Sequence, residues 1–229
     1  MKPVISLTTI PSRIEHITPC LTSLLSQGLP VYLWVPAVCT RTGDKLKRIP
    51  PLIEDIGAII NIVDDMGPIT KLLPALKAGH QHIITADDDH IYGKGWAKGL
   101  MKWAKRLPGS VVCYRGRIFG KDRTYKKSRV ITRVHRLADM VTTVSGVFYD
   151  SRFFSKSIFE EWKEWPMNDD IVVSGHLRQH DIPIEVVPFP KGAGLKRLRC
   201  MHTQPLYKIN PSINDEGLAK LFWSKPDAN

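Results

Sequence analysis

The sequence predicts a single-domain α/β fold, with a central, mostly parallel sheet flanked by helices and a small antiparallel portion. Two observations lead to this prediction. Short apolar segments typical of buried strands alternate with amphipathic helical segments through the first half of the chain. In addition, 229 residues with 43% apolar content are enough for one substantial core, and no internal repeat or low-complexity tract divides them.

The first half carries the regular alternation. Strands are expected at residues 4–9, 31–35, 58–63 and 82–85, and helices at residues 17–27 and 69–78. A further helix is expected at residues 95–107, because Trp96, Leu100 and Trp103 fall on one apolar stripe while the lysines fall on another. This rhythm is typical of parallel strands joined by helices.

The second half has a mixed pattern. Strands are expected at residues 111–114, 140–149 and 184–187, and helices near 158–163 and at 169–180. Long connections separate these segments. Some antiparallel pairing and a substrate-binding side built from long loops are therefore expected here.

The cysteines and the apolar segments bear on location. Cys20, Cys39, Cys113 and Cys200 show no metal-ligand spacing and no dense disulfide pattern, which favours a reducing compartment. No run of 18 or more apolar residues occurs, and the chain begins with a strand-like segment rather than a signal peptide. We therefore expect a cytoplasmic location.

The net charge of +11 is concentrated in one segment. Between Arg115 and Arg136 lie nine lysines and arginines against one aspartate. Such a segment is suited to nucleic acid, anionic lipid headgroups or a phosphorylated substrate. An ordinary solvated surface loop has the same composition.

The most informative motif follows the strand expected at residues 82–85. There the chain places Asp87, Asp88, Asp89 and His90 in succession. Clustered carboxylates repel one another unless a divalent cation or backbone donors neutralise them, and oxygen ligands favour Mg²⁺ or Mn²⁺. In extended backbone Asp87 and Asp89 share one face while Asp88 points to the other. The alternative is that these aspartates cap the helix that begins near residue 95.

A second group of polar residues follows the strand expected at residues 58–63. Asp64 and Asp65 precede Thr70 and Lys71 at the start of the next predicted helix. A helix start with a nearby lysine is suited to a phosphate group. A capped strand-turn-helix junction without a ligand explains the same residues.

The turn after the first strand limits the choice of cofactor. Residues 8–13 contain neither the glycine pattern of dinucleotide-binding turns nor that of phosphate-binding loops, which counts against both classes. Arg13 can still contact a phosphate or a base. Later in the chain, Asn168, Asp169 and Asp170 begin a predicted helix, where carboxylates also serve as favourable caps.

Taken together, residues 8–13, 64–71, the aspartate triplet, residues 144–149 and residues 168–170 resemble the motifs of glycosyltransferases with the GT-A fold, the Rossmann-like fold of nucleotide-diphospho-sugar transferases. Within that class the chain is most similar to small single-domain transferases of bacteria and large algal viruses. The resemblance extends over roughly residues 3–205. It implies a nucleotide-binding half at residues 1–110, and an acceptor-binding half with a C-terminal tail at residues 111–229.

The resemblance also implies roles for individual residues. The nucleotide and donor sugar would contact Thr8, Ile10, Arg13, Asp64 or Asp65, Lys71, Asp87, Asp88, Ser145 and Gly146. The metal ligands would be Asp89, Asp87 and His202, with His90 as another candidate for the metal environment. The catalytic base would be Asp170, with Asp169 beside it for acceptor hydroxyls.

The implied reaction is metal-dependent transfer of a hexose from a nucleoside diphosphate, most simply a UDP-sugar, to a glycan or glycoconjugate hydroxyl. Mn²⁺ or Mg²⁺ would stabilise the diphosphate charge, and a carboxylate on the opposite face would activate the acceptor with inversion. The alternatives are a sugar-nucleotide nucleotidyltransferase and a basic nucleic-acid-binding domain. The transferase interpretation predicts no nucleic-acid partner, and leaves Arg115 to Arg136 for peripheral contact with an anionic surface.

Overall fold

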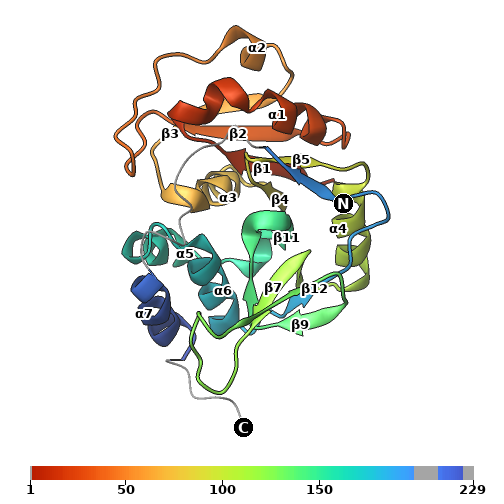
Figure 1. Ribbon diagram of the computed structural model, residues 1–229, viewed down its shortest axis with the longest axis vertical. Coiled ribbons are helices and arrows are strands. Elements are labelled where there is room, and N and C mark those ends of the chain that lie inside the picture. The colour runs from red at the N-terminus through yellow and green to blue at the C-terminus, as the bar shows by residue number, and fades with distance from the viewer. Residues whose placement is uncertain (1, 199–210, 224–229) are drawn as a thin grey trace.

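The computed structural model describes residues 2–198 and 211–223, and a large eight-stranded sheet forms its centre (Figure 1). The strand order is β3-β2-β1-β4-β11-β6-β12-β9. Their bounds are β1 Val4–Thr8, β2 Val31–Pro36, β3 Ile59–Val63, β4 His82–Ala86, β6 Val111–Cys113, β9 Arg136–Ala138, β11 Val147–Asp150 and β12 Ile184–Val186.

The sheet is mostly parallel, as the alternating pattern predicts. Strands β3, β2, β1 and β4 run parallel, and β12 runs parallel to β6. Strand β11 lies antiparallel between β4 and β6, and β9 closes one edge antiparallel to β12. The α/β fold with a small antiparallel portion is therefore confirmed. The sheet continues across residue 110, so both predicted halves of the chain contribute strands to it.

Helices cover both faces of this sheet (Figure 1). One face packs against α1 (Thr18–Leu25), α2 (Pro51–Glu54) and α4 (Trp96–Arg106), and the other against α3 (Leu73–Lys77), α5 (Ile158–Glu161), α6 (Asp169–Gln179) and α7 (Pro211–Leu221). The central strands are apolar throughout because successive side chains enter opposite cores: Ile83 packs into one and Ile84 into the other. Among the helices of the described residues, none is long and apolar enough to cross a membrane.

Two small sheets were not expected from the sequence. One has the order β10-β7-β8, formed by β10 (Met140–Val141), β7 (Arg115–Ile118) and β8 (Arg129–Thr132). The other pairs β5 (His90–Tyr92) with β13 (Leu195–Arg197). All of these strands are short, and β7, β8 and β13 carry basic residues, so they lack the long apolar runs by which the larger strands were predicted.

The helix expected at residues 69–78 is divided. A 3-10 turn covers Gly67–Lys71, and α3 begins only at Leu73. The prolines explain the division, because Pro68 and Pro74 each lie in the first turn of their element and Pro74 has no N–H with which to continue a longer helix.

The single strand expected at residues 140–149 is also wrong. Strand β10 ends at Val141, a 3-10 turn covers Thr143–Ser145, and β11 begins at Val147 in a different sheet. Gly146 has a φ of +105°, and a Cβ atom there would lie 2.4 Å from Cζ2 of Trp96. Trp96 also donates a hydrogen bond of 2.9 Å from Nε1 to the Ser145 carbonyl. Packing against this tryptophan therefore fixes the break.

We predict that Gly146→Ala destabilises the protein by about 3 kcal/mol or more, because the methyl group meets both a disallowed φ and the Trp96 ring. Gly109→Ala is the matched control, since Gly109 also has a positive φ but open space around it, and about 1 kcal/mol is expected there. Urea unfolding of both variants measures the difference. Equal losses at the two positions would contradict the role of Trp96.

Candidate active site

A cleft of about 760 Å³ opens at the carboxyl ends of β1, β2 and β4. Ligand sites of open α/β sheets lie at this edge. Its lining comes from both halves of the chain: the turns after β1 and β4, the 3-10 turn at 67–71, strand β7, residues 142–144 and the start of α6. The cleft therefore brings together most of the motifs that the sequence analysis identified.

The acidic turn at the end of β4 is held by backbone contacts. The Tyr92 hydroxyl accepts a hydrogen bond of 2.7 Å from the Asp87 amide and donates one of 3.0 Å to the Asp87 carbonyl. The Leu198 amide donates to the Asp89 carbonyl at 2.7 Å, next to the end of β13. Because Tyr92 lies on β5, the unpredicted β5–β13 pair fixes the conformation of the aspartate triplet.

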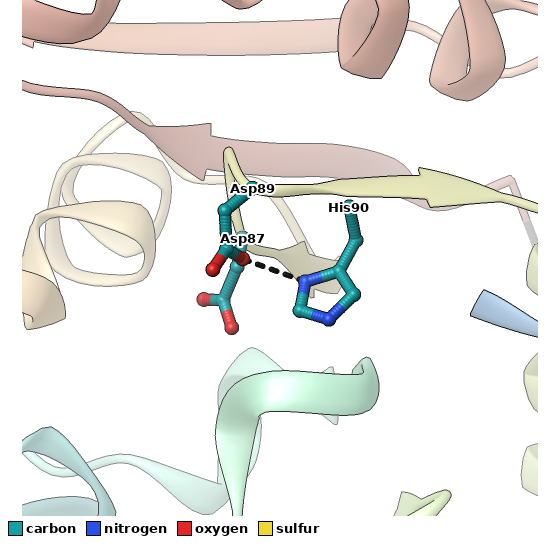
Figure 2. A group of neighbouring side chains, drawn as sticks. All are labelled: Asp87, Asp89 and His90. Carbon is teal, nitrogen blue, oxygen red and sulfur yellow. Dashed lines mark ion pairs between the residues drawn. The ribbon is translucent and has the colours of Figure 1, made fainter. Parts of the chain in front are cut away.

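Asp87, Asp89 and His90 form a cluster suited to a divalent cation (Figure 2). One possible ligand atom from each side chain lies within 4.8 Å of the other two. His90 Nδ1 lies 2.6 Å from an Asp89 oxygen, yet it is buried and makes no hydrogen bond of acceptable geometry with the described residues. Two carboxylates and an imidazole gathered in this way are a donor set that fits Mn²⁺ or Mg²⁺.

Asp88 points elsewhere. Its carboxylate accepts hydrogen bonds of 2.7 Å from the Thr9 hydroxyl and 2.8 Å from Arg13. Burial raises the pKa of Asp88 above its ordinary value, although Arg13 and Thr9 oppose this effect. Asp87 and Asp89 thus lie together and Asp88 apart, as the alternation predicts, even though the backbone forms a turn rather than a strand. Asp88 fastens the turn after β1 to the end of β4.

The charges within the cluster influence one another. Burial alone would raise the pKa of Asp89, but His90 and the nearby arginines hold it below its ordinary value. Burial alone would lower the pKa of His90, but Asp89 and Asp87 raise it. Because a ligating imidazole must be neutral, the raised pKa of His90 makes metal binding compete with protonation of this side chain.

Lys71 connects the acidic turn with the start of α6. Its ammonium group is 2.8 Å from Asp87 and 2.9 Å from Asp169, and it donates to the Thr143 hydroxyl at 2.9 Å. The residue is only 5% exposed. Burial would lower the pKa of Lys71, but Asp169 and Asp87 hold it well above its ordinary value. Lys71 is therefore a charged link between two carboxylates rather than an unpaired phosphate ligand.

The two aspartates that begin α6 both bind Thr143. The Thr143 hydroxyl donates to Asp169 at 2.9 Å, and the Thr143 amide donates to Asp170 at 2.8 Å. Burial and the neighbouring Asp169 raise the pKa of Asp170 to about 7. The carboxylates hydrogen-bond another segment instead of capping their own helix. Asp170 consequently has the proton affinity expected of a general base near neutral pH.

Arg115 and Arg117 line the cleft beside these aspartates. Arg117 donates to the Ser128 hydroxyl at 2.9 Å, and its guanidinium lies 4.4 Å from the centre of the Tyr125 ring. From sequence, both arginines were placed in the outer basic segment, and their position in the cleft was not predicted. The signal was the alternating order Arg115-Gly116-Arg117 directly after an apolar strand.

The other predicted contacts are distributed as follows. Thr8, Ile10 and Asp65 line the cleft; Thr8 donates to the Trp34 carbonyl at 2.9 Å, and Asp65 accepts from the Gly67 amide at 2.8 Å. Asp64 is exposed and does not line the cleft. Ser145 and Gly146 do not line the cleft either, because they pack against Trp96. His202 falls outside the described residues, as does Cys200.

Comparison with known proteins supports the fold. No family model matches the sequence, and no curated protein matches it. The chain is similar to S. aureus TarS, a glycosyltransferase, with a TM-score of 0.50, and to its residues 1–349 in complex with UDP, with a TM-score of 0.51. Both are 15% identical and cover 82% of this chain, which spans 35% and 58% of those chains. The fold is thus that of GT-A-like glycosyltransferases.

We predict that Lys71→Met lowers the free energy of unfolding by about 3–5 kcal/mol at pH 7, because it leaves Asp87 and Asp169 buried without their shared cation. Lys77→Met is the matched control, since Lys77 is exposed on the following helix and its loss should change stability by less than about 0.5 kcal/mol. Chemical denaturation measures the free energy of unfolding of both variants. A similar, small effect for the two variants would show that the link contributes nothing.

Proposed function

We propose that this chain is a divalent-metal-dependent glycosyltransferase that moves a sugar from a nucleoside-diphosphate sugar to a hydroxyl acceptor. The observation that carries the proposal is the pairing of two groups in one cleft. A cluster suited to a divalent cation lies at the end of β4, and a separate carboxylate with a pKa of about 7 lies at the start of α6. Sugar transfer requires both functions, one for the leaving group and one for the acceptor.

The donor is assigned to the side of the cleft formed by β1, β2 and β4. Thr8, Ile10, Arg13 and Asp65 line that side, as the resemblance to GT-A enzymes implies for nucleotide contacts. The UDP held by the similar TarS structure supports a uridine nucleotide. In this proposal Asp88 holds Arg13 in place for the donor, through an ion pair of 2.8 Å between Asp88 Oδ1 and Arg13 Nη1.

The metal is assigned to Asp89 and Asp87, with His90 as the third ligand among the described residues. When bound, Mn²⁺ or Mg²⁺ stabilises the negative charge that grows on the diphosphate. The earlier candidate His202 stays a prediction. Lys71 keeps Asp87 in place beside that charge through its 2.8 Å contact.

The base is assigned to Asp170. Asp169 is engaged by Lys71 and by the Thr143 hydroxyl, so it positions these groups. Asp170 accepts a hydrogen bond from the Thr143 amide and has no ion pair with the described residues. A proton acceptor with a pKa near 7 is suited to receive the proton of an attacking hydroxyl. A base apart from the metal cluster supports inversion at the anomeric carbon.

We also propose a donor, an acceptor and a location. The donor is a UDP-sugar, the acceptor is a glycan or glycoconjugate, and the chain acts in the cytoplasm like the small single-domain transferases it resembles. Nucleic-acid binding is not favoured, because Arg115 and Arg117 line the cleft instead of extending a continuous outer surface. The exposed arginines between residues 129 and 136 remain available for contact with an anionic surface.

We predict that UDP raises the melting temperature only when Mn²⁺ is present, because the cation holds the diphosphate against the acidic turn. Asp89→Asn should abolish this shift, whereas Asp170→Asn should keep it and lose at least about 100-fold in sugar transfer. Asp64→Asn removes an exposed carboxylate of the same type and should behave like the parent. A manganese-dependent shift that survives in Asp89→Asn would contradict the metal assignment.

We predict that kcat/KM rises with pH and levels off above about pH 8. The pKa of Asp170 is raised to about 7, so below this value the base is increasingly protonated and the rate falls about tenfold per pH unit. A profile of kcat/KM against pH from 5.5 to 9 measures this fall in rate. The residual activity of Asp170→Asn should lack the inflection near 7, and a parent profile that is flat across this range would rule out Asp170 as the base.

A further inference from the structure

Arg115 and Arg117 project from one face of β7 into the cleft. Between them, Gly116 faces the opposite way, where an added Cβ would lie 2.7 Å from Val186 and 2.8 Å from Ala138. Close packing at Gly116 fixes the register of the strand. The alternation of side chains along the strand then directs both guanidinium groups to the same side.

Neither arginine is neutralised by a carboxylate among the residues that the structure describes. No ion pair within 4.0 Å joins either guanidinium to an acidic side chain there, and both Nε atoms are buried without a hydrogen-bond partner. By contrast, Arg13 is paired with Asp88, and Lys71 with Asp87 and Asp169. Two adjacent guanidinium groups with unused donors form a site for an anion, because each presents a planar fork of N–H groups.

The position of this arginine pair identifies which substrate it meets. A series of contacts runs from Asp87 through Lys71 to Asp169, and Thr143 joins Asp169 to Asp170. The Thr142 amide then donates to the Arg115 carbonyl at 3.0 Å. Burial and Asp170 raise the pKa of Tyr125, whereas Arg117 and Arg115 lower it. These three charged side chains therefore all lie near Tyr125. In this series Asp170 contacts Thr143, which lies between Lys71 and the segment that pairs with Arg115.

We propose that Arg115 and Arg117 bind an anionic group of the acceptor, so that the enzyme glycosylates a glycan or glycoconjugate that carries phosphate, sulfate or carboxylate near the reacting hydroxyl. This inference rests on the proposed function, because it takes Asp170 as the base. The donor diphosphate is then held at the metal-type cluster and the acceptor charge at the arginine pair. In this proposal the two anions occupy separate parts of one cleft.

The test is calorimetric titration of sulfated maltohexaose and of neutral maltohexaose into the protein saturated with UDP and Mn²⁺. We expect the parent to bind the sulfated probe at least about tenfold more tightly than the neutral one. The double variant Arg115→Gln/Arg117→Gln should lose this preference. The matched double variant Arg129→Gln/Arg136→Gln removes the same charge from exposed positions outside the cleft and should keep the preference within about twofold.

Each other outcome overturns the inference. Equal weakening in both double variants would show a general effect of net charge. Binding of the sulfated probe to the nucleotide-free protein but not to the protein saturated with UDP and Mn²⁺ would assign the arginines to the donor diphosphate. Arg115 makes no side-chain hydrogen bond with the described residues, so the single variant Arg115→Gln serves if the double variant unfolds. A separate titration of UDP with Mn²⁺ alone tests the proposed function, which fails if the nucleotide does not bind.

Discussion

The buried ammonium group of Lys71 is the interaction on which this site depends. It lies 2.8 Å from Asp87 at the end of β4 and 2.9 Å from Asp169 at the start of α6, and it also donates to the Thr143 hydroxyl. Without this cation, two carboxylates would face each other where water screens them poorly. Lys71 therefore joins three segments that are distant in the sequence and makes their close approach possible.

The same charge distribution separates the roles of two neighbouring aspartates. Lys71 forms an ion pair with Asp169, whereas Asp170 has no ion pair with the described residues, accepts a hydrogen bond from the Thr143 amide and has a pKa of about 7. Adjacent residues of one type thus have different proposed roles, because Asp169 has a cationic partner among the described residues and Asp170 does not. A cationic partner on only one of two neighbouring carboxylates is a general way to obtain a base whose pKa lies near neutral pH.

The sequence predicted those features that arise from local pattern. Apolar runs identified β1, β2 and β4, and the aspartate triplet identified the cluster at the end of β4. Features that arise from contacts between distant residues were missed. The break near Gly146 depends on Trp96, fifty positions earlier, and the paired state of Lys71 depends on Asp169. The place of Arg115 in the cleft follows from how β7 packs, which its basic composition does not reveal.

One reversed strand assembles the two halves of the cleft. Strand β11 runs antiparallel to β4, with Val147 opposite Thr85, so the residues before β11 meet the residues after β4 at the same edge of the sheet. A parallel strand in this place would carry that segment to the opposite edge. Because of the reversal, Thr143 reaches both Lys71 and the aspartates of α6. The antiparallel strand therefore brings the proposed base into the same cleft as the proposed metal cluster.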